Sequence, residues 1–174
     1  MRVVVVGGTG NISTGIVKAL LEFGHEVNVF TRGKRSSALP DGVRFIEGDR
    51  KERAAFEETM QAEQFDAAID MISYNDEDAE SSIRAFRGVK HFIHCSTVCT
   101  YGGPLSEIPA TEECELRPTT DYGRNKVKAD AALMRAHVDG VLPVTILKPA
   151  HTFGSGWSVL RQFGGDPKWL DRIR

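Results

Sequence analysis

The sequence contains no apolar run that approaches the ~20 residues needed to cross a membrane as a helix, which predicts no membrane span. It has few cysteines, and the spacing of Cys95, Cys99 and Cys114 does not match that of a zinc site. We therefore expect no metal, and free thiols in the reducing cytoplasm. Basic and acidic residues nearly balance, 22 against 24, so the net charge of −2 predicts no bulk attraction to nucleic acid or to an anionic membrane.

The pattern along the chain is that of a folded α/β domain. Its 174 residues, 41% of them apolar, are enough for one globular domain with a real core. Short apolar runs that suit buried strands alternate with segments of helical periodicity. We predict strands over 3–6, 27–30, 43–46, 67–72, 91–96 and 144–147, helices over 12–21, 51–61, 76–87 and 121–137, and a long loop over 97–120. This order predicts a Rossmann-like, doubly wound parallel sheet with helices on both faces.

A glycine-rich segment, Gly7-Gly8-Thr9-Gly10-Asn11-Ile12-Ser13, joins the first predicted strand to the first helix. Glycines there allow a tight turn and a close approach of the backbone to a pyrophosphate, and the helix N-terminus supplies amide donors. We expect Gly7, Thr9, Gly10, Asn11 and Ile12 to bind a dinucleotide, with a plain glycine turn as the alternative. The segment lacks Gly-Lys-Ser/Thr, which disfavours a P-loop NTPase.

The segment after the second predicted strand bears on the choice of dinucleotide. The chain reads Arg32-Gly33-Lys34-Arg35 where an acidic residue would bind the ribose hydroxyls of NAD. Arg32 could instead pair with the 2′-phosphate of NADP, so the cofactor is NADP or NAD with NADP slightly favoured. The alternative for these residues is a solvated basic loop.

Tyr122 and Lys126 are spaced by four residues and so share one face of a predicted helix. A nearby ammonium favours the phenolate, so we expect the pKa of Tyr122 to lie below its ordinary value. Such a tyrosine can exchange a proton with a substrate hydroxyl. Without the glycine segment, a pair on a helix surface would be the preferred interpretation; together the two motifs favour catalysis.

Several short motifs extend over essentially the whole chain: Gly7-x-x-Gly10-x-x-Ser13, Gly48-Asp49-Arg50, His94-Cys95-Ser96-Thr97, Tyr101-Gly102, Tyr122-x-x-x-Lys126 and Lys148-Pro149. With these motifs the chain resembles the extended short-chain dehydrogenase/reductase family, in its NAD-dependent epimerase/dehydratase branch. The resemblance implies that Tyr122 is the catalytic acid/base, that Lys126 holds the nicotinamide ribose and tunes Tyr122, and that Thr97 binds the substrate oxygen.

The resemblance also implies roles for residues around these three. Ser96 is the second candidate for the substrate oxygen, and His151 is a substrate-facing position. The cofactor-binding residues would further include the pair that flanks adenine, the segment after the fourth strand and the residue beside the nicotinamide: Asp49, Arg50, Met71, Ile72, Ser73 and Pro149.

The implied function is an oxidoreductase-type epimerase or reductase acting on a nucleotide sugar or a similar hydroxyl or carbonyl substrate. Dehydration is disfavoured, because Val98 and Cys99 stand where the sugar dehydratases of the family carry an Asp-Glu pair. The resemblance leaves a homodimer open and gives no reason to expect a nucleic acid. The alternative is a non-catalytic module that senses a dinucleotide or associates with RNA, since chloroplast stem-loop-binding proteins share the glycine segment and Gly-Asp-Arg.

Relatives in this family continue for roughly a hundred further residues or more, which form most of the substrate pocket. We therefore expect residues 1–154 to form the NAD(P)-binding domain and residues 155–174 to begin a truncated substrate-binding region. A chain of this length is then expected to bind a dinucleotide and to turn over substrate poorly or not at all.

Overall fold

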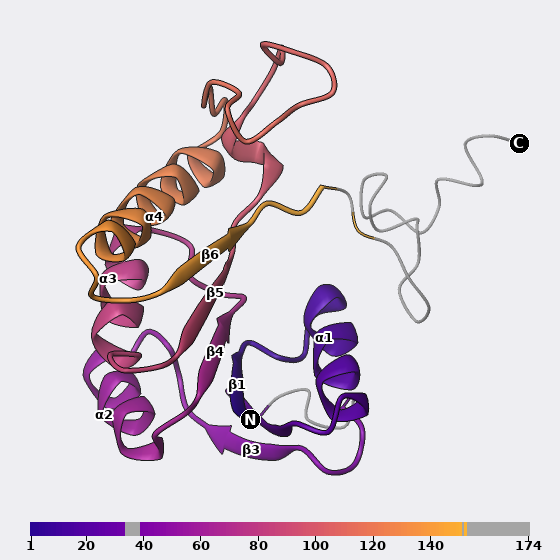
Figure 1. The fold of residues 1–174 in the computed structure, drawn as a ribbon, viewed down its shortest axis with the longest axis vertical. Coiled ribbons are helices and arrows are strands. Elements are labelled where there is room, and N and C mark those ends of the chain that lie inside the picture. The colour runs from indigo at the N-terminus through magenta and orange to yellow at the C-terminus, as the bar shows by residue number, and fades with distance from the viewer. Residues whose placement is uncertain (34–38, 151, 153–174) are drawn as a thin grey trace, which may run out of the picture.

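The computed structural model describes residues 1–33, 39–150 and 152, and every structural statement below refers to these residues. A six-stranded sheet forms the centre of the molecule (Figure 1). Its strands all pair in parallel, in the order β3-β2-β1-β4-β5-β6. The strands are β1 (Arg2–Val6), β2 (Glu26–Thr31), β3 (Arg44–Glu47), β4 (Ala67–Asp70), β5 (His91–Cys95) and β6 (Val144–Leu147). The predicted doubly wound parallel sheet is confirmed.

Helices cover both faces of this sheet, as predicted. Helix α1 (Asn11–Glu22) lies on one face, and the opposite face carries α2 (Arg53–Glu63), α3 (Asp76–Ala85) and α4 (Asp121–Val138) (Figure 1). The predicted loop over 97–120 contains one turn of 3₁₀ helix, η2 (Val98–Thr100). The remainder of the loop rises beyond the end of α4 (Figure 1).

The central position of β1 explains why the run Val3–Val6 is apolar at every position. Val3 and Val5 belong to the hydrophobic cluster on the α1 side. Val4 and Val6 belong to the larger cluster beneath α2, α3 and α4. A central parallel strand is buried on both faces, so it cannot show the alternation of a half-exposed strand.

Two predicted strands are shorter than expected at their carboxyl ends. Strand β4 ends at Asp70, where a carboxylate oxygen of Asp70 accepts a hydrogen bond of 3.0 Å from the backbone N–H of Ile72 and turns the chain. Strand β5 ends at Cys95 instead of residue 96. The residues released from both strands line the cleft described next. The proposed region 155–174 lies outside the described residues, so that boundary stays a prediction.

Candidate active site

A cleft of about 330 Å³ opens at the carboxyl ends of the central strands. The strand order reverses between β1 and β4, because the chain leaves β1 for α1 on one face and β4 for α3 on the other. Open α/β sheets bind ligands at such a point. The cleft is lined by Gly7, Gly10, Asn11, Ile12, Ser13, Met71, Ile72, Tyr74, Cys95, Ser96, Thr97, Tyr122, Lys126, Pro149, Ala150 and Thr152.

Gly7 makes the turn that carries the chain from β1 towards α1. Its φ is +84°, a left-handed conformation that favours glycine, and its N–H donates to the Phe30 carbonyl over 2.9 Å. A Cβ added there would lie 2.6 Å from Cγ2 of Ile72. The turn therefore brings its backbone against the segment after β4 and leaves no room for a side chain.

The N-terminus of α1 faces the cleft with its backbone amides. Helix amides at this end carry a partial positive charge and have no partner within the helix. Ser13 is buried, and its hydroxyl accepts a hydrogen bond of 2.8 Å from Gly10 N–H. The Asn11 amide reaches across the cleft mouth to the Thr152 carbonyl over 3.3 Å.

Lys126 lies at the floor of the cleft and is only 1% exposed. Its Nζ donates hydrogen bonds to the carbonyls of Ser73 (2.7 Å) and Cys95 (2.6 Å), which extend from the ends of β4 and β5. Burial lowers the pKa of Lys126, and nearby carboxylates, led by that of Asp70, oppose this. The ammonium has three N–H donors, and two of them are used by these carbonyls. Within the part of the chain that the structure describes, the third is left for a ligand.

Tyr122 stands in the first turn of α4 and is 45% exposed. The Thr120 hydroxyl caps this helix by accepting a hydrogen bond from Gly123 N–H over 3.1 Å. The expectation of a lowered Tyr122 pKa is wrong for this structure: burial raises that pKa, and a hydrogen bond with the Thr97 side chain only partly opposes the rise. The physical reason is that burial removes water from the phenol and so disfavours the charged phenolate.

Thr97 and Ser96 follow β5 and use their hydroxyls differently. Thr97 Oγ1 accepts from Cys99 N–H over 3.2 Å and so caps η2. The Ser96 hydroxyl donates to Oδ2 of buried Asp130 over 2.8 Å. Ser96 is therefore engaged with α4, whereas the Thr97 side chain opposes the rise in the pKa of Tyr122.

The structure brings most of the predicted site residues into one cleft. The residues that line it include eleven of those predicted from the sequence: Gly7, Gly10, Asn11, Ile12, Met71, Ile72, Ser96, Thr97, Tyr122, Lys126 and Pro149. Ser73 lies just behind the wall and contributes its carbonyl to Lys126. Thr9, Arg32 and Asp49 do not line this cleft, and His151 lies outside the described residues.

Arg50 is the predicted cofactor residue that the structure places farthest from its expected role. Its side chain is 5% exposed, and its guanidinium donates to Asp70 Oδ2 over 3.0 Å and to the Ser82 hydroxyl over 2.6 Å. It also stacks on the Phe56 ring, 4.8 Å from the ring centroid. The guanidinium is therefore directed into the protein and engaged with buried groups, which does not fit the expected contact with adenine.

Two further residues stand in the cleft beside Tyr122 and Lys126, and sequence reasoning missed one of them, Tyr74. The Tyr74 ring lies 5.2 Å from Lys126 Nζ and 6.4 Å from the Tyr122 ring. Cys95 lines the cleft through the last position of β5, and burial raises the pKa of its thiol. Tyr74 follows the predicted strand 67–72 by two residues, and this position was the available signal, because the carboxyl ends of parallel strands meet at one edge.

A carboxylate also approaches the segment after β2, which the sequence around Arg32 did not suggest. Glu47, at the end of β3, would lie 3.3 Å from a Cβ added at Gly33. Strands β2 and β3 pair in parallel, so the ends of the two strands meet although 16 residues separate Thr31 from Glu47. An acidic group therefore stands near Arg32 after all.

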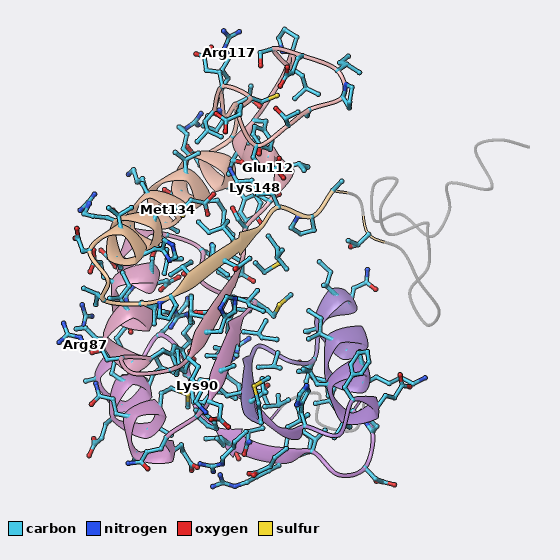
Figure 2. All side chains as sticks on the ribbon, in the orientation of Figure 1. Arg87, Lys90, Glu112, Arg117, Met134 and Lys148 are labelled. Carbon is cyan, nitrogen blue, oxygen red and sulfur yellow. The ribbon has the colours of Figure 1, made fainter. Side chains whose placement is uncertain are left out.

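A larger apolar depression of about 960 Å³ lies on the other side of α4, away from the Tyr122 face. Met134 on α4 and Lys148 after β6 mark its two sides, with Glu112 of the long loop above (Figure 2). It holds none of the three residues Thr97, Tyr122 and Lys126.

No helix in the described part of the chain has both the length and the apolar character for a membrane crossing.

Comparisons with known proteins agree with this geometry. The model of the NAD-dependent epimerase/dehydratase family matches residues 3–168. The chain is 33% identical to 2′-dehydrokanamycin reductase of Streptomyces kanamyceticus over 98% of this chain and 48% of that protein. It is 26% identical to the chloroplast stem-loop binding protein of 41 kDa b of Arabidopsis thaliana, over 88% of this chain and 42% of that one.

Among solved structures, UDP-glucose 4-epimerase from Brucella ovis in complex with NAD aligns with a TM-score of 0.75 and 27% identity, covering 84% of this chain and 51% of that chain. The chain thus spans about half the length of the curated relatives it matches.

Proposed function

The chain belongs to the NAD-dependent epimerase/dehydratase family, and from this premise we propose that it is an NAD(P)-dependent oxidoreductase-type epimerase or reductase. Its substrate is a nucleotide sugar or a similar compound with a hydroxyl or carbonyl group. The observation that carries this proposal is the convergence of Thr97, Tyr122 and Lys126 on the cleft that the glycine-rich turn also lines.

The cleft suits a dinucleotide. Gly7 carries no side chain at the turn, and the amides in the first turn of α1, which have no partner within the helix, suit a pyrophosphate. Gly10, Asn11 and Ile12 would hold the phosphates, while Met71, Ile72 and Pro149 would border the nicotinamide half. When bound, the nicotinamide supplies hydride transfer to or from carbon.

The chain's own residues provide the proton chemistry. The pKa of Tyr122 is not lowered towards neutrality, so its phenol is protonated near neutral pH and can donate that proton to a carbonyl oxygen during reduction. Thr97, which lines the same cleft as Tyr122, would orient and polarise the same oxygen. Lys126 would give its remaining N–H to a ribose hydroxyl and bring a positive charge beneath the phenol.

The preference for NADP rests on Arg32, which is exposed after β2 and could pair with a 2′-phosphate. Glu47 acts against it, because a carboxylate near Gly33 would repel that phosphate and could accept a ribose hydroxyl. Calorimetric titration with NADP and NAD compares the two: Arg32→Ala should weaken NADP binding only, and Glu47→Gln should strengthen it. Equal NADP binding in all three proteins would refute the role of Arg32.

The decisive experiment combines binding with turnover. The full chain is titrated with both dinucleotides and assayed with UDP-sugars, dTDP-sugars and an oxidised aminoglycoside. Wild-type turnover is expected to be low in this chain, so the two proteins are compared at high enzyme concentration. Tyr122→Phe should keep dinucleotide binding and lose about 10²–10⁴-fold of the wild-type turnover, the usual contribution of a positioned acid/base. Tyr101→Phe, outside the cleft, is the matched control and should retain activity. Undiminished turnover in Tyr122→Phe, or no dinucleotide binding by the wild type, would refute the proposal.

RNA association is the second candidate, because a stem-loop binding protein is among the relatives. Filter binding of RNA at increasing salt separates the two: useful affinity with a steep salt dependence would favour this candidate.

We also assign the activity to the cytoplasm, since Cys95, Cys99 and Cys114 all carry free thiols. A homodimer is the assembly to test by size-exclusion chromatography with light scattering.

A further inference from the structure

A buried ion pair lies beneath the floor of the cleft. Asp70 is fully buried, and its Oδ2 accepts hydrogen bonds from Arg50 (3.0 Å) and from the Ser82 hydroxyl (2.7 Å). Its Oδ1 accepts the Ile72 N–H over 3.0 Å. A carboxylate removed from water requires such partners to remain ionised. The Arg50 guanidinium therefore supports a negative charge at the end of β4.

This carboxylate determines the path of the segment that holds Lys126. The hydrogen bond from Ile72 to Asp70 turns the chain out of β4, and the next carbonyl, that of Ser73, accepts Lys126 Nζ over 2.7 Å. Oδ2 of Asp70 accepts from Arg50, whereas Oδ1 accepts from the backbone of the turn. Asp70 thus connects the arginine beneath the sheet edge to the lysine in the cleft.

Asp70 is also the strongest of the opposing charges around Lys126. Burial lowers the pKa of Lys126, and Asp70 on β4 counteracts this more than Cys95 on β5, Asp130 on α4 or Asp78 on α3. An opposite charge in a low-dielectric site has a large influence on protonation, because water screens it poorly. The geometry and the charge therefore act on the same ammonium.

We propose that Asp70, held by Arg50, is a positioning residue for Lys126 that orients the Ser73 carbonyl and supplies the negative charge that keeps the buried ammonium protonated. The functional meaning of this assignment rests on the proposed function, in which the charged Lys126 acts on a ribose and beneath Tyr122. Arg50 then serves the site from below, through Asp70, instead of contacting the dinucleotide itself.

The test measures Lys126 directly in the full chain without any dinucleotide. Protein labelled with ¹³C,¹⁵N-lysine is titrated by NMR, and the Lys126 signal is identified by its loss in Lys126→Arg. Asp70→Asn keeps the size and an acceptor at position 70 but removes the charge. We expect the midpoint of the Lys126 titration to fall by about one pH unit, the lower end of the effect of an adjacent opposite charge. An unchanged midpoint in folded Asp70→Asn would overturn the proposal.

Two further variants separate this role from simple stabilisation. Asp66→Asn, which breaks the surface pair of Asp66 with Lys90 on the same stretch of chain, should leave the Lys126 midpoint unchanged. If Asp70→Asn unfolds because Arg50 is left unpaired, Arg50→Gln/Asp70→Asn replaces the ion pair by two amides and should show the same fall. Unfolding of both variants, or an equal fall in Asp66→Asn, would count against the proposal.

Dinucleotide titrations on the same proteins keep the two proposals apart. Asp70→Asn should lose dinucleotide affinity at a lower pH than the wild type, in parallel with the deprotonation of Lys126. If the wild type binds no dinucleotide, the proposed function fails while the lysine titration still decides the role of Asp70. If binding is normal but the Lys126 midpoint does not move, the assignment of Asp70 alone is rejected.

Discussion

Replacing Gly7 by alanine perturbs the glycine-rich turn where its geometry is most restrictive. The alanine would keep a φ of +84°, which costs an L-residue roughly 1 kcal/mol. Its Cβ would also lie 2.6 Å from Cγ2 of Ile72, a β-branched side chain that cannot easily rotate away. Overpacking of this kind costs about 1–3 kcal/mol. We therefore expect Gly7→Ala to lower the free energy of unfolding by about 2–4 kcal/mol and to abolish dinucleotide binding.

Urea unfolding followed by circular dichroism measures this change, and a double-variant cycle separates its two causes. Gly7→Ala/Ile72→Ala relieves the contact but keeps the strained φ. Its loss in free energy of unfolding should therefore be smaller than the sum of the two single losses by about 1 kcal/mol or more. Gly15→Ala in α1 is the control: its added Cβ meets nothing within 4 Å, and it should raise stability by about 0.5–1 kcal/mol. A Gly7→Ala chain within about 0.5 kcal/mol of the wild type that still binds dinucleotide would refute this reasoning.

Three further outcomes can be measured on the same chain. Two arginine side chains lower the pKa of Glu63 to about 2, so its contribution to stability is present above pH 4.5 and is lost as the pH falls towards 2; Glu63→Gln should cost about 1 kcal/mol at pH 7 and flatten the acid limb of urea midpoints plotted against pH. Asn75→Ala removes the α3 cap, in which Oδ1 accepts Asp78 N–H over 2.8 Å, and should cost about 1 kcal/mol in thermal unfolding; no change in the melting temperature would contradict this. Exposed Cys99 should react with iodoacetamide before Cys95, whose raised pKa delays its reaction until higher pH, and NADP should protect Cys95 only, as read by peptide mass spectrometry.

Most of the fold could be predicted from the sequence because its signals are local. The run Val3–Val6 is apolar at every position, and this indicates a strand buried on both faces whatever packs against it. Alternation of such runs with helical periodicity leaves few arrangements besides a doubly wound parallel sheet. The ends of β4 and β5 were predicted one or two residues too late, because the turn at Asp70 depends on a side-chain hydrogen bond that periodicity does not report.

The candidate site divides in the same way. The sequence by itself determined the residues whose neighbours are close in the chain: the glycine-rich turn before α1, and Tyr122 one helical turn from Lys126. Only the tertiary structure decided what meets across strands: Tyr74 over Lys126, Glu47 beside Gly33, and the Arg50 guanidinium directed into the protein.

Tertiary structure also decided the protonation of the site, against expectation. Spacing along a helix places an ammonium near a phenol, but it does not say that two carbonyls from β4 and β5 hold that ammonium or that burial dominates around Tyr122. Spacing is a property of neighbours in the chain, whereas desolvation and the direction of a hydrogen bond depend on every group packed around an atom. The sequence therefore determined which ionisable groups are present, and packing determined their hydrogen-bond partners and the direction in which their pKa values shift.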